Sequence, residues 1–570
     1  MAETLLSPGV LARENDSSQV SRGPATVGAS IIGPAVKGPV EIPTTVTSYS
    51  QYKSIFGGAV TSGSDSYNYF TGISVYNYFQ NGGETVLVTR VTSGSFSEAS
   101  STPVINTISA TSSSFTLETL SEGTIMNNSG SQSQGALVSG STDNVRWEIA
   151  SVNTSSGQFS LLVRSGNDNN RDKTILETWT NLSLDPKAEN YIESVIGNSK
   201  KVVLNDNGSY YVQDQGTFRN KSSYVRVSSV TAKTPDYFDN NGIAKTVYTA
   251  SLPIVGSGSF TGAVGDLFNP AVAANFYEKV ATADIQGLVS TDYTTAVQLM
   301  ANRDEYRYNS ISVPGVTSQN GASTVTSVVN NSVNRGDNIS IVDLVNYQAN
   351  VGTVTTQAAA FDSSYAATYW PWCQTIDPET GKQIWVPASV MIPGVYAYTD
   401  ASADAWFAPA GLTRGSLGTV IRAERKLPST TRDTLYEANV NPIATFPQSG
   451  VVVFGQKTLQ KRASALDRVN VRRLLIAVKG YVSQIADTLV FEQNSMSTRN
   501  NFLTQVNPYL ESVQQRQGLY AFKTVMDESN NGPDVVDRNQ LVGQIFLQPT
   551  KTAEFVLLDF NVTPTGATFE

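Results

Sequence analysis

The residue types that carry most enzyme chemistry are scarce in this 570-residue chain. It contains no histidine and one cysteine, Cys373. Without histidine, a Ser-His-Asp triad, a His-containing zinc site and a facial-triad iron site are all impossible. A single cysteine excludes an intrachain disulfide and a multi-cysteine metal cluster, and we expect Cys373 to be a small buried residue. The composition therefore argues against most hydrolases and metalloenzymes.

Two acidic segments have residue types that bind phosphate or calcium. The segment "DPETGKQ" at Asp377 lacks the first glycine of a phosphate-binding loop and the Ser or Thr after Lys382. The segment "GNDNNRDK" contains Asp168 and Asp172 but no flanking helices and no terminal bidentate glutamate. We interpret the first as a hairpin turn and the second as a solvated turn. We therefore predict no catalytic, cofactor-binding or metal-binding residue, and no cofactor.

Basic residues are concentrated in the segment "QKTLQKRASALDRVNVRRLLIAVKG". Seven of them accompany one acidic residue, Asp467; the seven are Lys457, Lys461, Arg462, Arg468, Arg472, Arg473 and Lys479. The whole chain has a net charge of -9, so this segment has a local field of opposite sign. It is either a solvated helix face or a surface that docks on an acidic partner. The overall negative charge argues against direct binding of nucleic acid.

The elements that would position these residues begin with an α/β pattern. A β-branched strand ends at Gly33, a short amphipathic helix at residues 51–56 ends at Gly57, and a second helix spans residues 69–79. A strand at 85–91 completes the unit. Two buried strands at residues 308–316 and 338–347, with a helix between them, indicate that the unit resumes later in the chain.

Residues 92 to about 264 have a different pattern. Runs rich in Ser and Gly separate short alternating segments, and the turn Ser155-Ser156-Gly157 between two of them predicts a hairpin. We therefore predict a β-rich insertion that interrupts the α/β unit. A chain of this length needs several separate cores, so a division into domains is expected.

The C-terminal third predicts helices followed by strands. A long helix is indicated by apolar residues at alternating steps of four and three: Val471, Leu475, Val478, Val482, Ile485 and Leu489. A pair of short helices is predicted in 498–518, with Asn507 as a cap and Pro508 in the first turn. Three strand candidates follow, "LYAFKTVMD", "QLVGQIFLQ" and "EFVLLDFNVT". The last is apolar on both faces, so its backbone edges require a pairing partner.

Several of these segments resemble the tail sheath proteins of contractile-tailed bacteriophages, especially the T-even-like group. The resemblance is strongest in "GVVVFGQKTL", "NVRRLLIAVKGYV" and "AFKTVMDESNNGPDVVDRNQLVGQIFLQPTKTAEFVLLDF", and it extends to "LLSPGV", "VGASIIGPAVKGPV" and "NYFQNGGETVLVTRV" near the start. It covers roughly residues 1–100 and 300–570. The insertion matches no family that we recognise.

The resemblance implies a structural protein without enzymatic activity. Such a subunit polymerises as stacked hexameric rings around the tail tube and contracts to drive the tube through the host envelope for genome delivery. Its partners are other copies of itself, the tail tube protein, and the baseplate and tail terminator proteins, with no direct contact to nucleic acid or membrane. It is made in the host cytoplasm and resides in the virion tail. This agrees with the absence of a signal-peptide pattern and of an 18-residue apolar run.

The implied fold class is α+β or α/β with several domains. We expect an N-terminal arm at 1–20, an α/β middle domain at 21–100 and 265–440, an outward-facing insertion at 101–264, an inner tube-proximal domain at 441–552 built with both chain ends, and a C-terminal strand arm at 553–570. In sheath proteins the two arms add strands to neighbouring subunits. The implied donated residues are Leu5, Leu6, Val10, Leu11, Phe555, Val556, Leu557, Leu558, Phe560 and Val562. The implied acceptor residues are Leu541, Val542, Ile545, Phe546 and Leu547, and the seven basic residues are candidates for the surface that faces the tube.

Two other functions fit part of the sequence. The sheath of a tail-derived, pyocin-like injection device has the same physical requirements as a phage sheath. A β-rich virion surface or receptor-binding protein fits the Ser/Thr-rich insertion but needs no terminal arms. An enzyme is disfavoured, because the chain lacks histidine and carries no catalytic motif.

Overall fold

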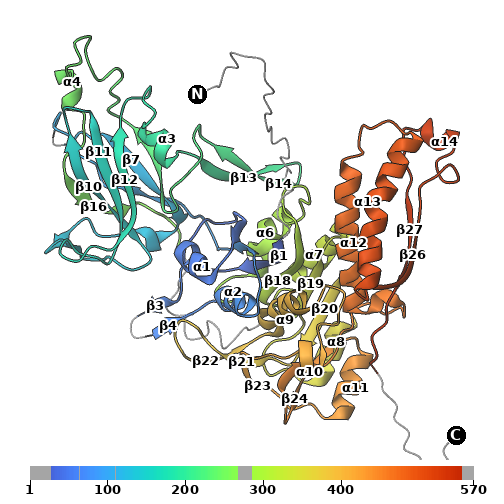
Figure 1. The fold of residues 1–570 in the computed structure, drawn as a ribbon. Coiled ribbons are helices and arrows are strands. Elements are labelled where there is room, and N and C mark those ends of the chain that lie inside the picture. Colours follow the sequence, from blue (N-terminus) through green and yellow to red (C-terminus); the bar gives the residue numbers. More distant parts are fainter. Residues whose placement is uncertain (1–26, 63–64, 110, 267–284, 555–570) are drawn as a thin grey trace, which may run out of the picture.

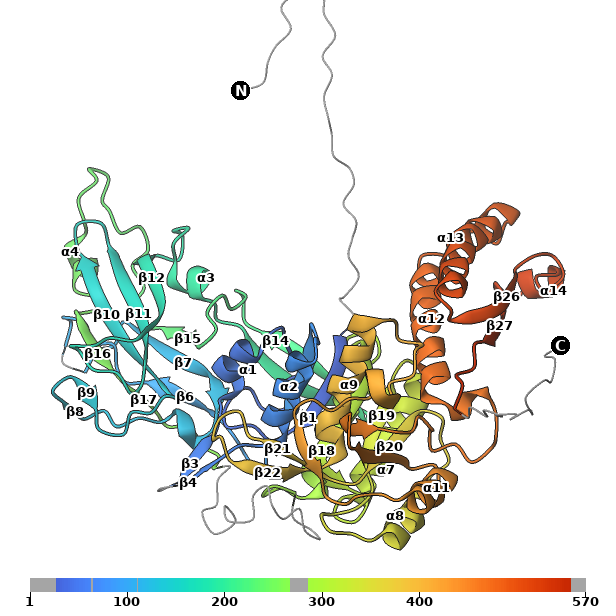
Figure 2. The same cartoon turned by 60° about the horizontal axis from the view of Figure 1, so that its bottom comes forward.

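The computed structural model describes residues 27–62, 65–109, 111–266 and 285–554. These residues form three bodies in a row, with the insertion at one end, a large sheet in the middle and a helical unit at the other end (Figure 1). Figure 2 shows the same order from a second direction. The predicted arm residues from Leu5 to Leu11 and from Phe555 to Val562 lie outside the described residues.

An eight-stranded sheet forms the central body, in the order β2-β5-β1-β18-β19-β20-β24-β25. Its strands are β1 (Val27–Gly33), β2 (Thr44–Val46), β5 (Val86–Arg90), β18 (Tyr308–Thr317), β19 (Ile339–Asp343), β20 (Ala366–Trp370), β24 (Asn441–Phe446) and β25 (Gly450–Val453). Strand β1 pairs in parallel with both β5 and β18. The predicted α/β unit and its resumption after the insertion are thus confirmed. The sheet ends at Val453, so the α/β body extends beyond residue 440, where the sequence analysis places its boundary.

Helices cover both faces of this sheet, which explains why every residue of β5 and β19 is buried. The helices are α1 (Tyr49–Phe56), α2 (Phe70–Gln80), α6 (Thr294–Leu299), α7 (Ala322–Arg335), α8 (Val351–Ala358), α9 (Ala388–Ser402), α10 (Gly411–Arg414) and α11 (Ser429–Glu437). Helix α1 ends at Gly57 as predicted but begins at Tyr49, two residues earlier than expected. The side chain of Ser48 caps it by accepting a 3.2 Å hydrogen bond from the amide of Gln51. Helices α2 and α9 approach closely at Gly394, where a Cβ would lie 3.0 Å from the carbonyl oxygen of Asn77.

Smaller sheets border the central body. They comprise β3 (Val60–Ser62) with β4 (Asp65–Tyr67), and β21 (Cys373–Ile376) with β22 (Gln383–Val386) and β23 (Val420–Ala423). The segment at Asp377 connects β21 to β22, which confirms the predicted hairpin turn. Cys373 is fully buried, and burial raises the pKa of its thiol to about 12. The cysteine is therefore an inert part of the core at neutral pH.

The insertion is a β-sandwich of two four-stranded sheets, β12-β11-β10-β16 and β15-β7-β6-β17. Its elements are β6 (Glu98–Ser101), β7 (Phe115–Glu122), β8 (Gln132–Ser133), β9 (Ala136–Leu137), β10 (Val145–Asn153), β11 (Gln158–Ser165), β12 (Ile175–Ser183), α3 (Ile192–Ile196), β15 (Val225–Val230), α4 (Thr246–Thr249), β16 (Gly256–Gly258) and β17 (Phe260–Thr261). The rings of Phe115 and Phe159 stack between the sheets with centroids 5.5 Å apart. Asn153 pairs with Gln158 across the predicted hairpin. The prediction of a β-rich insertion is confirmed.

The segment at Asp168 is a turn with Asp172 exposed, as predicted, but Asp168 itself is not solvated. The Asp168 side chain is fully buried and lies 2.7 Å from Nε of Arg164 and 3.3 Å from Nη1 of Arg146. Both arginine side chains are also fully buried. Two buried guanidinium groups need an anion beside them, and the loop that follows β11 folds back to supply it. The aspartate therefore neutralises buried charge instead of facing water.

The insertion is attached firmly to the central body. A hairpin of β13 (Lys200–Asp206) and β14 (Ser209–Gln215) reaches from the insertion to α6, and its residues Val203, Tyr210 and Val212 pack against the core of the central body (Figure 1). On the opposite side of the junction, buried Arg90 donates hydrogen bonds to the carbonyl oxygens of Gly38 and Glu122. Two separate contacts therefore fix the orientation of the insertion.

The C-terminal unit packs two helices against a two-stranded sheet. Its elements are α12 (Val469–Asp487), α13 (Met496–Gln515), β26 (Leu519–Val525), α14 (Pro533–Val536) and β27 (Gln544–Pro549). The long helix is confirmed, whereas the predicted pair of short helices is a single helix, α13, with Pro508 inside it. Phe502, Val506 and Leu510 form one buried face that continues across Pro508. Burial of this face stabilises the unbroken helix despite the lost hydrogen bond.

Among the described residues, no helix combines the length and the apolar character needed to cross a bilayer.

Candidate functional site

The two-stranded sheet of the C-terminal unit is the main candidate for contacts with other molecules. Within the described residues, β26 and β27 pair antiparallel with each other and with no other strand. Each strand therefore has one edge that is not paired with a strand of the described chain. Such an edge presents backbone donors and acceptors to an incoming strand.

The two faces of this sheet have different surroundings. Phe522, Ile545 and Leu547 pack inward against the apolar core between α12 and α13. Tyr520 and Phe546 point outward, with 63% and 56% of their surface exposed. The inner face fixes the sheet on the helices, while the outer face carries the exposed Tyr520 and Phe546.

The predicted acceptor residues fall on two different elements. Ile545, Phe546 and Leu547 lie on β27, as expected. Leu541 and Val542 precede this strand, and the prediction that they belong to it is wrong. The reason is the side chain of buried Asn531, which exchanges two 2.8 Å hydrogen bonds with the backbone of Val542 and so takes the groups that a strand ladder would use. The sequence signal for Asn531 is the turn-forming run "SNNG", which the prediction did not use.

The seven basic residues do not form a common exposed face. Arg472 and Arg473 are only 4% and 6% exposed. The guanidinium of Arg472 lies 3.9 Å from the ring centroid of Tyr365, and that of Arg473 lies 4.5 Å from the ring centroid of Tyr396. The first turns of α12 are buried all round, because the helix begins against the central body. The expectation that these two arginines belong to a solvated helix face or a docking surface is therefore wrong.

Other members of the cluster have contacts within the chain. Lys457 donates a 2.7 Å hydrogen bond to the carbonyl oxygen of Tyr436, and burial lowers the pKa of its amine. Arg468 forms ion pairs with Asp467 and Glu554. The remaining members, Lys461, Arg462 and Lys479, are exposed. Lys461 and Lys479 also make hydrogen bonds within the chain, to the carbonyl oxygen of Ala359 and to the hydroxyl of Tyr365. Of the seven candidates for the tube-facing surface, only these three are exposed.

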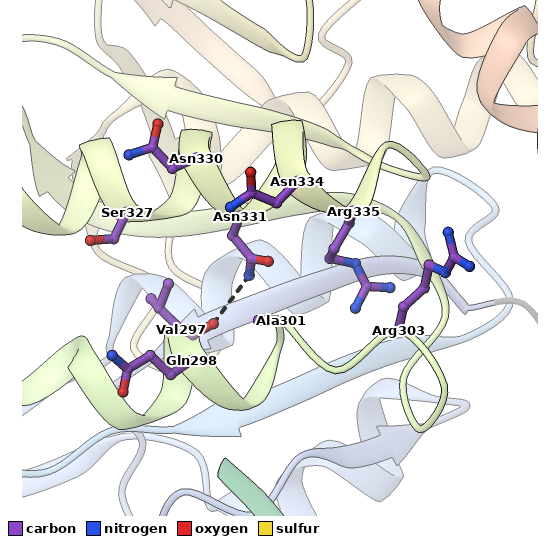
Figure 3. Close-up of a pocket in the computed structure, with 9 residues that line it drawn as sticks. All are labelled: Val297, Gln298, Ala301, Arg303, Ser327, Asn330, Asn331, Asn334 and Arg335. Carbon is purple, nitrogen blue, oxygen red and sulfur yellow. Dashed lines mark hydrogen bonds between the residues drawn. The ribbon is translucent and has the colours of Figure 1, made fainter. Parts of the chain in front are cut away.

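A polar pocket between α6 and α7 has no arrangement for catalysis (Figure 3). Asn331 crosses the gap and donates a 3.1 Å hydrogen bond to the carbonyl oxygen of Val297. The guanidinium of Arg335 is engaged with the carbonyl oxygens of Met300 and Tyr306 and with Asp337. These side chains hold the two helices together. In the part of the chain that the structure describes, no cluster of three or more acidic or cysteine side chains is placed to hold a metal ion.

Two family models match adjacent regions in the second half of the chain. The model of the phage tail sheath protein central domain matches residues 286–459, and the model of the phage tail sheath C-terminal domain matches residues 462–563. The central match includes most strands of the large sheet, and the second match includes the C-terminal unit.

Two curated relatives carry the name tail sheath protein. The protein of Vibrio phage KVP40 is 38% identical over 230 residues, which is 40% of this chain and 33% of the relative. The protein of Enterobacteria phage T4 is 33% identical over 228 residues, which is 40% of this chain and 35% of the relative. The matches thus span about a third of the length of these relatives.

Solved structures share the fold over nearly the whole chain. The sheath tail protein Lin1278 from Listeria innocua has a TM-score of 0.52 at 10% identity, covering 92% of this chain and 96% of that one. The helical sheath of the anti-feeding prophage in its contracted state has a TM-score of 0.50 at 16% identity, covering 97% of this chain and 98% of that one. The chain therefore carries the two domains of phage tail sheath proteins, the central domain at residues 286–459 and the C-terminal domain at residues 462–563.

Proposed function

We propose that this protein is the sheath subunit of a contractile phage tail. It polymerises as stacked hexameric rings around the tail tube, and contraction drives the tube through the host envelope for genome delivery. Its partners are further copies of itself, the tail tube protein, and the baseplate and terminator proteins. The curated relatives are phage proteins, which favours a virion tail over a tail-derived injection device.

The observation that carries this proposal is the pair of unpaired edges on β26 and β27. The arms at residues 1–20 and 553–570 supply the strands that fill the corresponding edges on neighbouring subunits. Such a contact joins two different surfaces of the same chain, so it does not close on one partner and instead builds an extended array. Backbone hydrogen bonds provide the linkage, while the apolar side chains of the arms give it register.

Contraction on this proposal needs neither a cofactor nor hydrolysis. The three bodies move as near-rigid units, and the arms keep the subunits joined while their packing changes. The work comes from the free-energy difference between an extended and a contracted packing of the same chain. Calorimetry tests this point: contraction should release heat or raise the thermal stability of the assembly, and neither effect would mean that no such energy is stored.

Electron microscopy of the purified full-length chain is the direct test of assembly. We expect rings or hollow tubes. A chain shortened after Thr552 should remain folded by circular dichroism but stay monomeric in sedimentation, because it has lost the donated strand. Full-length protein that stays monomeric under all assembly conditions, or a shortened chain that forms normal tubes, would contradict the proposal.

A further inference from the structure

The last described residue, Glu554, is held by three side chains from distant parts of the sequence. Arg468 donates two hydrogen bonds to its carboxylate, from Nε at 2.7 Å and from Nη2 at 2.9 Å. The hydroxyl of Tyr436 donates a third at 2.9 Å, and Nε2 of Gln456 donates a fourth at 3.1 Å. The Glu554 side chain is only 19% exposed.

The groups around this carboxylate are themselves fixed. Tyr436 belongs to α11, Gln456 follows β25, and Arg468 is the residue at which α12 begins. Arg468 also forms a 3.0 Å ion pair with Asp467 and lies over the ring of Tyr436. Gln456 donates a further 2.5 Å hydrogen bond to the hydroxyl of Thr552. Tyr436, Gln456 and Arg468 thus form a preorganised binding site for a carboxylate, with the bidentate Arg468 as its main donor.

The geometry distinguishes this contact from an ordinary surface ion pair. A surface pair joins two mobile side chains and contributes little, because both lose freedom on pairing. Here one carboxylate accepts four hydrogen bonds, and its partners are anchored in the central body. Burial alone would raise the pKa of Glu554, but the hydrogen bonds from Arg468, Tyr436 and Gln456 outweigh burial and lower it. The carboxylate is therefore ionised at neutral pH.

We propose that Glu554 is the anchor of the C-terminal segment, and that Arg468, Tyr436 and Gln456 form the site that receives it. This inference rests on the proposed function, in which the residues after Glu554 are donated to a neighbouring subunit. The anchor fixes the point at which the segment leaves its own subunit. Tyr436 and Gln456 belong to the central body, and Arg468 is the residue that precedes α12, so a pull on the segment is transmitted to the central body. Strand β27, which ends at Pro549, is thereby protected from that pull during contraction.

The chain contains a convenient reporter of this anchor. Lys551 is exposed and lies three residues before Glu554, and trypsin cleaves after lysine only when several flanking residues become extended. We expect E554Q and R468Q to be cut after Lys551 about tenfold faster than the wild-type chain, because proteolysis follows the population of the open form. Mass spectrometry of the full-length, unassembled protein measures this rate. The matched controls are E528Q and R462Q, which change exposed residues of the same types.

A charge exchange and a truncation decide the interpretation. The double variant E554R/R468E keeps an ion pair and should return the cleavage rate toward that of the wild type, whereas each single reversal should not. For these variants the lysine-specific protease Lys-C replaces trypsin, because trypsin would also cut after the new arginine at position 554. Equal cleavage of E554Q, R468Q and wild-type protein would overturn the anchor. A chain that ends at Glu554 keeps the anchor but lacks the donated strand. If it assembles normally, the proposed strand exchange is wrong, while the cleavage rates still decide the anchor on their own.

Discussion

Nη2 of Arg473, on α12, donates a 2.6 Å hydrogen bond to each carboxylate oxygen of Asp400, near the end of α9. The same guanidinium lies over the ring of Tyr396, one turn earlier on α9. The contact joins the C-terminal unit to the central body and leaves Arg473 only 6% exposed. This arginine therefore acts in the joint between two bodies and is not available to a tail tube.

Replacing Arg473 by alanine should destabilise the isolated subunit. The change removes a buried guanidinium that packs on Tyr396 and pairs with the exposed Asp400. We expect a loss of about 2 kcal/mol in the free energy of unfolding. Urea unfolding monitored by tryptophan fluorescence gives this value. The exposed Arg462 provides the control, since R462A should change stability by less than about 0.5 kcal/mol. Equal stability of both variants would mean that the joint does not depend on the ion pair.

Charge reversal at the exposed members of the basic cluster should weaken binding to the tail tube. The double variant R462E/K479E changes the sign of two accessible charges without disturbing a buried contact. We expect its assembly on purified tubes to fall most at low ionic strength, because salt screens exposed charges beyond about 10 Å at 0.1 M. Co-sedimentation with tubes at two salt concentrations measures the effect. K233E, in the insertion, is the control; an equal loss in that variant would argue against a specific tube-facing surface.

The stability of the subunit should depend on pH through Asp343. This carboxyl group, at the end of β19, accepts hydrogen bonds from the amide and hydroxyl of Ser389 at the start of α9. Burial raises its pKa from 3.8 to about 7, and the hydrogen bonds from Ser389 oppose that shift only partly. Between these two values the folded chain keeps a proton that the unfolded chain has released. The stabilisation that comes from the raised pKa of Asp343 is therefore complete below about pH 4. It is lost as the pH rises through about 7.

The variant D343N isolates this contribution. Its side chain keeps an acceptor for Ser389 but does not titrate, so its stability relative to wild type should increase as the pH rises from 4 to 7. The difference approaches ~1.4 kcal/mol per pH unit in this window. Urea unfolding of both chains at pH 5 and pH 7.5 measures it. Burial also raises the pKa of Glu122 to about 7, but that group is common to both chains and cancels in the comparison. A constant difference between them would show that Asp343 is ionised throughout.

A polar substitution on the hairpin of β13 and β14 should release the hairpin and so loosen one of the two contacts that hold the insertion. Val212 packs against the central core, whereas its neighbour Tyr211 points away and is 38% exposed. V212D places a charge in the contact. We expect the cost of burying this charge, about 2 kcal/mol, to exceed the free energy of the contact between the hairpin and the central body. The radius of gyration from X-ray scattering should rise, with the thermal unfolding of the central body unchanged. Y211D is the matched control, and a similar expansion of that variant would mean that the charge acts elsewhere.

The sequence predicts the elements whose stability comes from neighbouring residues. The short helix ending at Gly57, the hairpin at Ser155-Ser156-Gly157 and the long helix from Val469 are all marked by local periodicity and by turn or capping residues. The sequence motifs also indicate the sheath family, because they occur in the family's order along the chain. These features depend on residues that are close in sequence, so they are visible before folding.

Contacts between distant segments are decided only by the tertiary structure. The chain brings Tyr436, Arg468 and Glu554 together, and it buries Arg472 and Arg473, although their charge favours an exposed face. In each case the free energy depends on what covers the side chain, which helical or strand periodicity does not report. The sequence by itself determined the locally marked elements and the resemblance to tail sheath proteins. The packing of the three bodies decided which charges are buried as partners of one another and which remain on the surface, because only packing sets the exposure of each charge to water.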